Sequence, residues 1–125
     1  MKISNMLIID DSSTARMIIK RCFETAGYAG IEFLQAEDGL EALDILNSSE
    51  IDLIVADMNM PKMDGEDLIK KIKLNEKLKK IPVIIISSNQ NDVIRNEMDE
   101  LGILGFIQKP VKPENIISLI GQCDE

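Results

Sequence analysis

Short runs of apolar residues alternate along the chain with longer segments in which apolar residues recur at helical spacing. Residues 6–9, 53–56 and 83–86 are apolar at every position, and residues 105–108 form a further short strand-like segment. The segment 31–36 carries a polar Gln35, which is typical of a strand at the edge of a sheet. Strands that are apolar on both faces and are separated by helices predict a parallel sheet that helices cover on both sides.

The first two intervening segments have clear helical periodicity and helix ends. Residues 13–26 are predicted to be a helix with Ser13 as its N-cap and Gly27 as its stop. Asp38 and Glu41 have the spacing of a capping box at the start of the next helix. The apolar residues on these two helices are Ala15, Ile18, Ile19, Cys22, Phe23 and Ala26, and then Leu40, Leu43 and Leu46.

Three further helices complete five strand–helix units. They are predicted at about 66–73, at about 92–101, and from Pro113, which suits the first position of a helix, to a stop near Gly121. A chain of 125 residues fits one domain, here residues 1–125, and can bury a core without disulfides or a structural metal.

Composition narrows the class of protein. Aromatic residues make up 3% of the chain, so the core is expected to be aliphatic. The balance of 14 basic against 22 acidic residues argues against non-specific binding to nucleic acid or anionic lipid. The chain contains no His, which excludes histidine acid–base catalysis, Ser-His-Asp triads and histidine metal sites.

Several features indicate a cytoplasmic protein. Cys22 and Cys123 each fall on an apolar helical face, which favours two reduced core thiols in a reducing compartment. Asp10 and Asp11 cut off the first apolar run, which makes it too short for a signal peptide. No apolar stretch approaches the roughly 20 residues that span a membrane.

Chemically active residues gather where the predicted strands end. Asp10 and Asp11 follow the first strand, Asp57 follows the third, Ser87 and Ser88 follow the fourth, and Lys109 follows the fifth. In open α/β sheets ligands bind beyond the carboxyl ends of the strands, so these side chains are expected on one rim. Clustered carboxylates repel one another and destabilise the fold unless a cation is present. Oxygen ligands without His or thiolate suit a hard cation, and Mg²⁺ is the natural one where phosphate is involved.

These residues, in this order and register, resemble the response-regulator receiver domain family over essentially the whole chain. That family has a doubly wound, flavodoxin-like three-layer sandwich with five parallel strands in the order 2-1-3-4-5. The matching residues are the acidic pair Asp10 and Asp11, the phosphoacceptor Asp57 with the loop 58–65, the hydroxyl residue Ser87, the Lys109–Pro110 pair and the aromatic switch position Phe106.

The resemblance implies a mechanism. Asp57 accepts a phosphoryl group from a phosphohistidine on a sensor kinase or phosphotransfer protein. Mg²⁺ is held by Asp11, Asp57 and the backbone carbonyl of Asn59, while Asp10 holds a metal-bound water. Lys109, ahead of a cis bond to Pro110, supplies a second positive charge.

The resemblance also implies a switch. Ser87 bonds the new phosphoryl group, Phe106 turns inward, and the face of the fourth helix, fifth strand and fifth helix binds a downstream protein. Such a chain is expected to be a monomer or at most a weak dimer. Two positions depart from the family pattern. Phe106 has no hydroxyl where Tyr stands in the chemotaxis type, and Ser88 is larger than the Ala or Gly that is frequent there.

Two other classes of protein remain as alternatives. A flavodoxin-type electron carrier has the same sheet order, and Ser12, Ser13 and Thr14 faintly match its phosphate loop. That loop has no Gly here, however, Asp10 and Asp11 would repel a phosphate, and aromatics to stack on a flavin are nearly absent. An aspartyl-phosphate hydrolase of the haloacid dehalogenase type wants a second Asp where this chain has Asn59. A P-loop is excluded because G-x-x-x-x-G-K is absent. The cognate kinase, the output and the length of the complete regulator are left open.

Overall fold

A computed structural model describes residues 3–58, 65–88 and 92–120 of the protein. Five parallel strands form one sheet in the order β2-β1-β3-β4-β5, which confirms the predicted fold class. The strands are β1 (Asn5–Ile9), β2 (Glu32–Ala36), β3 (Leu53–Asp57), β4 (Val83–Ser87) and β5 (Gly105–Gln108). The helices are α1 (Ser13–Phe23), a π-helical turn η1 (Glu24–Tyr28), α2 (Gly39–Ser48), α3 (Gly65–Leu74), α4 (Asp92–Glu100) and α5 (Pro113–Ile120).

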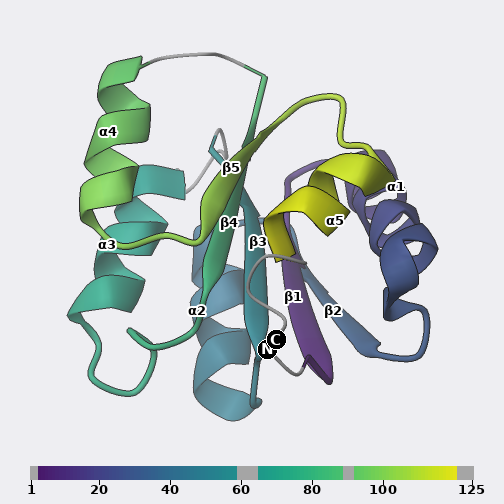
Figure 1. The fold of residues 1–125 in the computed structure, drawn as a ribbon. Coiled ribbons are helices and arrows are strands. Elements are labelled where there is room, and N and C mark those ends of the chain that lie inside the picture. The colour runs from purple at the N-terminus through teal and green to yellow at the C-terminus, as the bar shows by residue number, and fades with distance from the viewer. Residues whose placement is uncertain (1–2, 59–64, 89–91, 121–125) are drawn as a thin grey trace.

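The helices cover both faces of the sheet, as Figure 1 shows: α1 and α5 lie on one side, and α2, α3 and α4 lie on the other. Successive residues of a strand point to opposite faces, so each central strand supplies both cores. Leu7 and Ile9 of β1 belong to the core under α2, α3 and α4. Met6 and Ile8 belong to the core under α1 and α5. Residues 6–9, 53–56 and 83–86 of the three central strands are therefore apolar at every position because both of their faces are buried.

The start of α1 corrects the predicted cap. Ser12, not Ser13, is the N-cap, and its hydroxyl accepts a hydrogen bond from the backbone N–H of Ala15 at 3.2 Å. The α-helix ends at Phe23 and passes into the π-helical turn, and Gly27 is the stop, as predicted, because its φ and ψ are not helical. Gly27 lies inside that turn with φ of 115°, a conformation that favours glycine.

The start of α2 confirms the predicted cap at Asp38, whose carboxylate accepts from the backbone N–H of Glu41 at 2.8 Å. The Glu41 side chain accepts in return from Glu37, one residue before the cap, at 3.3 Å. Helical spacing misjudges two apolar residues: Ile18 is 49% exposed and Leu40 is 52% exposed.

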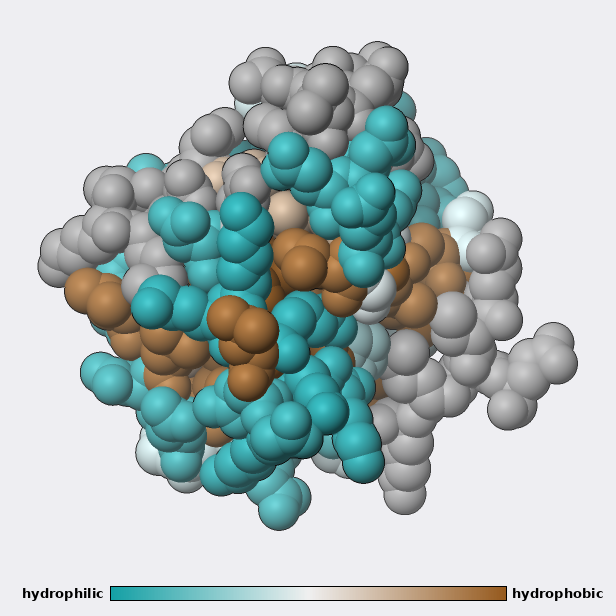
Figure 2. Space-filling view, turned by 90° about the vertical axis from the view of Figure 1, so that its left-hand side faces the viewer, coloured by the Kyte–Doolittle hydropathy of each residue, from teal (hydrophilic) through white to brown (hydrophobic). Residues whose placement is uncertain are grey.

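The remaining predictions fall mostly within one residue of the observed ends. Pro113 opens α5, as the sequence predicts. Gly121 and Cys123 lie outside the described residues. Figure 2, which faces the side of α3 and α4, shows hydrophilic residues interrupted by hydrophobic ones. Within the described part of the chain, no helix combines the length and the apolar character needed to cross a bilayer.

Candidate functional site

Three carboxylates meet at the carboxyl ends of the neighbouring strands β1 and β3. In the register of these strands Ile9 is paired with Ala56, so the next residues, Asp10 and Asp57, leave the sheet side by side. One oxygen from each of Asp10, Asp11 and Asp57 lies within 4.8 Å of the others. Asp10 and Asp57 are buried, at 1% and 5% exposure, while Asp11 is exposed. The topology therefore assembles the acidic cluster that the sequence predicts.

Lys109 provides a cation at this cluster. Its Nζ lies 3.5 Å from Oδ2 of Asp10 and 3.5 Å from Oδ1 of Asp57. The Lys109–Pro110 peptide bond is cis, as the resemblance implies. The backbone N–H of Lys109 donates to the carbonyl of Ser87 at 2.9 Å, which extends the β4–β5 pairing beyond the strand. One ammonium thus serves two buried carboxylates, and the cluster keeps an excess of negative charge.

Asp10 has an acceptor left open. Its Oδ1 accepts from the backbone N–H of Ser12 at 2.9 Å. Its Oδ2 is buried and has no hydrogen-bond partner among the described residues. Buried polar atoms without a partner are costly, and a bound ion or water is a common reason for them.

The donor set fits a hard divalent cation. All three side chains offer carboxylate oxygens, which are the ligands that Mg²⁺ prefers. The buried Oδ2 of Asp10 accepts no hydrogen bond from the described residues and lies 3.5 Å from Nζ of Lys109. Asn59, whose backbone carbonyl is the other predicted ligand, lies outside the described residues.

The predicted switch residues lie on β4 and β5. Ser87 is the last residue of β4 and is buried, on the strand next to β3. Ser88 follows it and is exposed. Phe106 pairs with Ile85 in the β4–β5 register, is half-buried, and packs against the core under α2, α3 and α4.

One charged residue at the site has no counterpart in the sequence reasoning. Arg16, in the first turn of α1, donates from Nη1 to the backbone carbonyl of Asp10 and from Nε to Oε1 of Gln35 at 2.9 Å. Every residue has a backbone carbonyl, so the sequence does not show which one a side chain binds. Only the position of Arg16 shortly after the acidic pair could have suggested its role.

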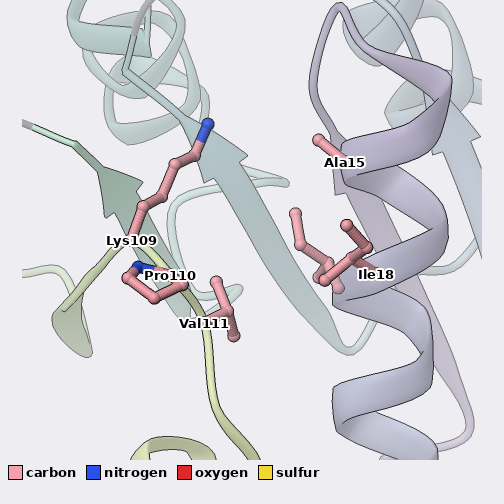
Figure 3. Close-up of a pocket in the computed structure, with 6 residues that line it drawn as sticks. Ala15, Ile18, Lys109, Pro110 and Val111 are labelled. Atoms are coloured by element: carbon pink, nitrogen blue, oxygen red, sulfur yellow. The ribbon is translucent and has the colours of Figure 1, made fainter.

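A largely apolar pocket of about 390 Å³ opens beside the site, between α1 and the segment after β5. Figure 3 shows Lys109, Pro110 and Val111 facing Ala15 and Ile18 across it. Ile19 completes the lining.

Cys22 lies behind this segment and is half-buried rather than fully in the core, which corrects the sequence prediction. Its Sγ donates to the carbonyl of Val111 at 3.3 Å. Burial, and secondarily the negative charge of Glu114, raise the pKa of the Cys22 thiol above its usual value. The thiol is therefore a poor nucleophile at neutral pH.

Comparisons with known proteins agree with this geometry. The family model of the response regulator receiver domain matches residues 6–121. Chemotaxis protein CheY-3 of Vibrio cholerae is 39% identical over 105 residues, which make up 84% of this chain and 79% of that protein. Chemotaxis protein CheY1 of Helicobacter pylori is 36% identical over 110 residues, or 87% of each chain. The solved structure of the chemotaxis response regulator CheY4 of Vibrio cholerae superposes with a TM-score of 0.83 at 26% identity and covers 97% of this chain and 98% of that chain.

Proposed function

The chain belongs to the response regulator receiver domain family of two-component signalling, and from that premise we propose that it is a phosphorylation-dependent switch with Asp57 as its phosphoacceptor. The observation that carries the proposal is the buried Asp57 carboxylate, which shares the Nζ of Lys109 with Asp10 at 3.5 Å on each side. The switch comprises residues 1–125 as one receiver domain.

The proposed reaction transfers a phosphoryl group to an oxygen of Asp57. The new O–P bond forms as the P–N bond of a phosphohistidine on the partner breaks, and the electron pair of that bond stays on the imidazole nitrogen. Approach of two anions needs positive charge, and catalysis of such transfers is mostly positioning and electrostatics. Lys109 neutralises part of that charge from its place beside Asp57.

Mg²⁺ is the proposed cofactor. Asp11, Asp57 and the backbone carbonyl of Asn59 would hold it directly, and Asp10 would hold it through a water. When bound, it neutralises charge on the transferring phosphoryl oxygens. Asp10 contributes to this site by keeping its buried Oδ2 free of other hydrogen bonds.

The proposed output is a change in the face formed by α4, β5 and α5. Ser87 donates its hydroxyl to the phosphoryl group and moves toward Asp57. Because the Lys109 N–H is bonded to the Ser87 carbonyl, the ends of β4 and β5 shift together. Phe106, half-buried on β5, then turns inward and alters the surface that a downstream protein binds. Phe106 makes this turn without a hydroxyl.

The phosphodonor partner is a sensor histidine kinase or a phosphotransfer protein. The apolar pocket beside Lys109, together with the exposed Met17 and Ile18 on α1, offers this partner an apolar binding surface near Asp57. Burial of such surface contributes roughly 25 cal/mol per Å². The names of the relatives favour chemotaxis as the pathway.

We further propose that the protein acts in the cytoplasm, as a monomer or at most a weak dimer, and that it catalyses only its own phosphorylation and slow dephosphorylation. The two alternatives have less support. An electron carrier would need a flavin beside the carboxylates of Asp10 and Asp11, which repel its phosphate. A hydrolase would need an acid where Asn59 stands.

Incubation with a small phosphodonor and Mg²⁺ tests the assignment. We expect one phosphoryl group that is labile to both acid and base, and we expect Asp57→Asn to abolish it. Asp44→Asn, on the exposed face of α2, is the matched control and should label like the unaltered protein. Undiminished labelling of Asp57→Asn would show that Asp57 is not the acceptor.

A further inference from the structure

The side chain of Arg16 links the acidic loop after β1 to the edge strand β2. Its guanidinium bridges two groups from different strands: the carbonyl of Asp10, just past β1, and the side chain of Gln35 on the edge strand β2. It contacts no carboxylate of the cluster in these bonds. We infer that Arg16 is a positioning residue, which holds the loop after β1 so that Asp10 and Asp11 meet Asp57 in a cation-binding arrangement.

Other hydrogen bonds also hold this loop, one of them to β2 and the others within the loop and the start of α1. The Asp10 N–H donates to the carbonyl of Ala36, and its Oδ1 accepts from the Ser12 N–H. The Arg16 N–H donates to the carbonyl of Ser12 at 3.0 Å within the first helical turn. The N–H of Asp10 is thus bonded to β2, and its carbonyl is bonded to the side chain of Arg16.

Asp11 gains most from this arrangement. Asp11 is exposed, so the main chain of this loop sets the place of its carboxylate relative to Asp57. Outer groups that orient metal ligands typically change metal affinity 10–100-fold when they are removed. The inference rests on the proposed function, because it assigns Arg16 a task at the proposed Mg²⁺ site.

A positioning role and a purely electrostatic role for Arg16 predict opposite changes in Mg²⁺ affinity when its side chain is removed. A nearby positive charge repels a bound cation, so removal of the Arg16 charge alone should tighten Mg²⁺ binding. Loss of positioning should weaken it. Gln35 separates the two effects further, because Gln35→Met removes one anchor of the guanidinium and leaves every charge in place.

The experiment compares Arg16→Met, Arg16→Lys and Gln35→Met with the unaltered protein. Arg21→Met is the charge control, since Arg21 is exposed in the last turn of α1, far along the helix from Asp10. Titration calorimetry measures Mg²⁺ affinity, and thermal melting without metal measures the fold. We expect about tenfold weaker Mg²⁺ binding for Arg16→Met, at the lower end of the usual range. Arg16→Lys should lie in between, Gln35→Met should lose a few-fold, and Arg21→Met should bind at least as tightly as the unaltered protein.

Two outcomes would overturn the inference alone: equal or tighter binding by Arg16→Met, or unchanged affinity of both Gln35→Met and Arg16→Lys. If Arg16→Met fails to fold, Gln35→Met decides the question, because its side chain is exposed and its removal leaves the core intact. Absence of Mg²⁺ binding by the unaltered protein would instead overturn the proposed function, and the inference with it.

Discussion

Removal of one carboxylate from the cluster should stabilise the metal-free protein. At 4.8 Å, two unit charges interact with about 0.9 kcal/mol in a water-like dielectric, which suits the exposed Asp11. Two neighbours, Asp10 and Asp57, bring the repulsion to about 1.7 kcal/mol, before salt and Lys109 reduce it. Asp11 also lies just before α1, where the helix dipole favours a negative charge by about 0.3–1 kcal/mol. Repulsion wins, and Asp11→Ala should stabilise by about 0.5–1 kcal/mol.

Added Mg²⁺ should make the unaltered protein more stable than Asp11→Ala, the reverse of their order without metal. A ligand that binds only the folded protein stabilises it by RT ln(1 + [L]/Kd), about 2.7 kcal/mol at 100 times Kd. The unaltered protein should therefore gain strongly in melting temperature when Mg²⁺ is added, and Asp11→Ala should lose most of that gain. In the absence of metal, the same variant should melt roughly 2–4 °C higher than the unaltered protein.

Asp38→Ala is the matched control, because it removes the same charge from a helix cap. Loss of the bond from the Glu41 N–H should cost about 1 kcal/mol and leave the Mg²⁺ response intact. Melting followed by far-ultraviolet circular dichroism, with and without Mg²⁺ at matched ionic strength, measures all three proteins. A lower metal-free melting temperature for Asp11→Ala, or a full Mg²⁺ response, would refute a shared cation site.

Three further predictions concern the surroundings of the site. Lys109→Met should destabilise the metal-free protein by about 1–2 kcal/mol in urea, because two buried carboxylates lose their cation, and unchanged stability would refute this. Gly105→Ala should cost less than about 1 kcal/mol in urea unfolding, because the added Cβ would lie 2.5 Å from Cδ1 of Leu119, the end of a half-buried side chain that can turn aside, and a larger loss would refute this. In a Cys123→Ser background, Cys22 should alkylate more slowly than a cysteine peptide, with a rate that still rises above pH 9.0. Because the pKa of Cys22 is raised in the folded protein, its contribution to stability is fully present below pH 9.0 and is lost as pH rises through the folded-state pKa. Alkylation of Cys22 at the rate of the cysteine peptide would contradict the raised pKa and this pH dependence of stability.

The sequence predicted the fold and most of the site for one physical reason. Parallel strands buried on both faces are apolar throughout, so the first polar residue after each run marks the strand's carboxyl end. Asp10 and Asp57 could be placed together because their strands are neighbours in the sheet.

The pattern of apolar residues could not identify side chains that bind backbone atoms, and it could not choose between neighbouring residues that suit the same role equally well. Arg16 was missed because its bond goes to a carbonyl. The N-cap of α1 was placed one residue late because Ser12 and Ser13 are equally suitable in sequence. Ile18 was counted on the apolar face of α1, although it is exposed, because spacing identifies a helical face and not its exposed margin.

The order of the strands has a consequence for synthesis of the chain. Because β1 lies between β2 and β3, the first 57 residues supply three adjacent strands, and β4 and β5 add afterwards on one side only. A nascent chain can therefore pair these three strands while the open edge of β3, apolar on both faces, still waits for β4. Such an unpaired apolar edge is where aggregation starts. In a nascent chain that has paired these three strands, the carboxylates of Asp10 and Asp57 lie together before Lys109 has been added, so dissolved cations are then the available counter-charge.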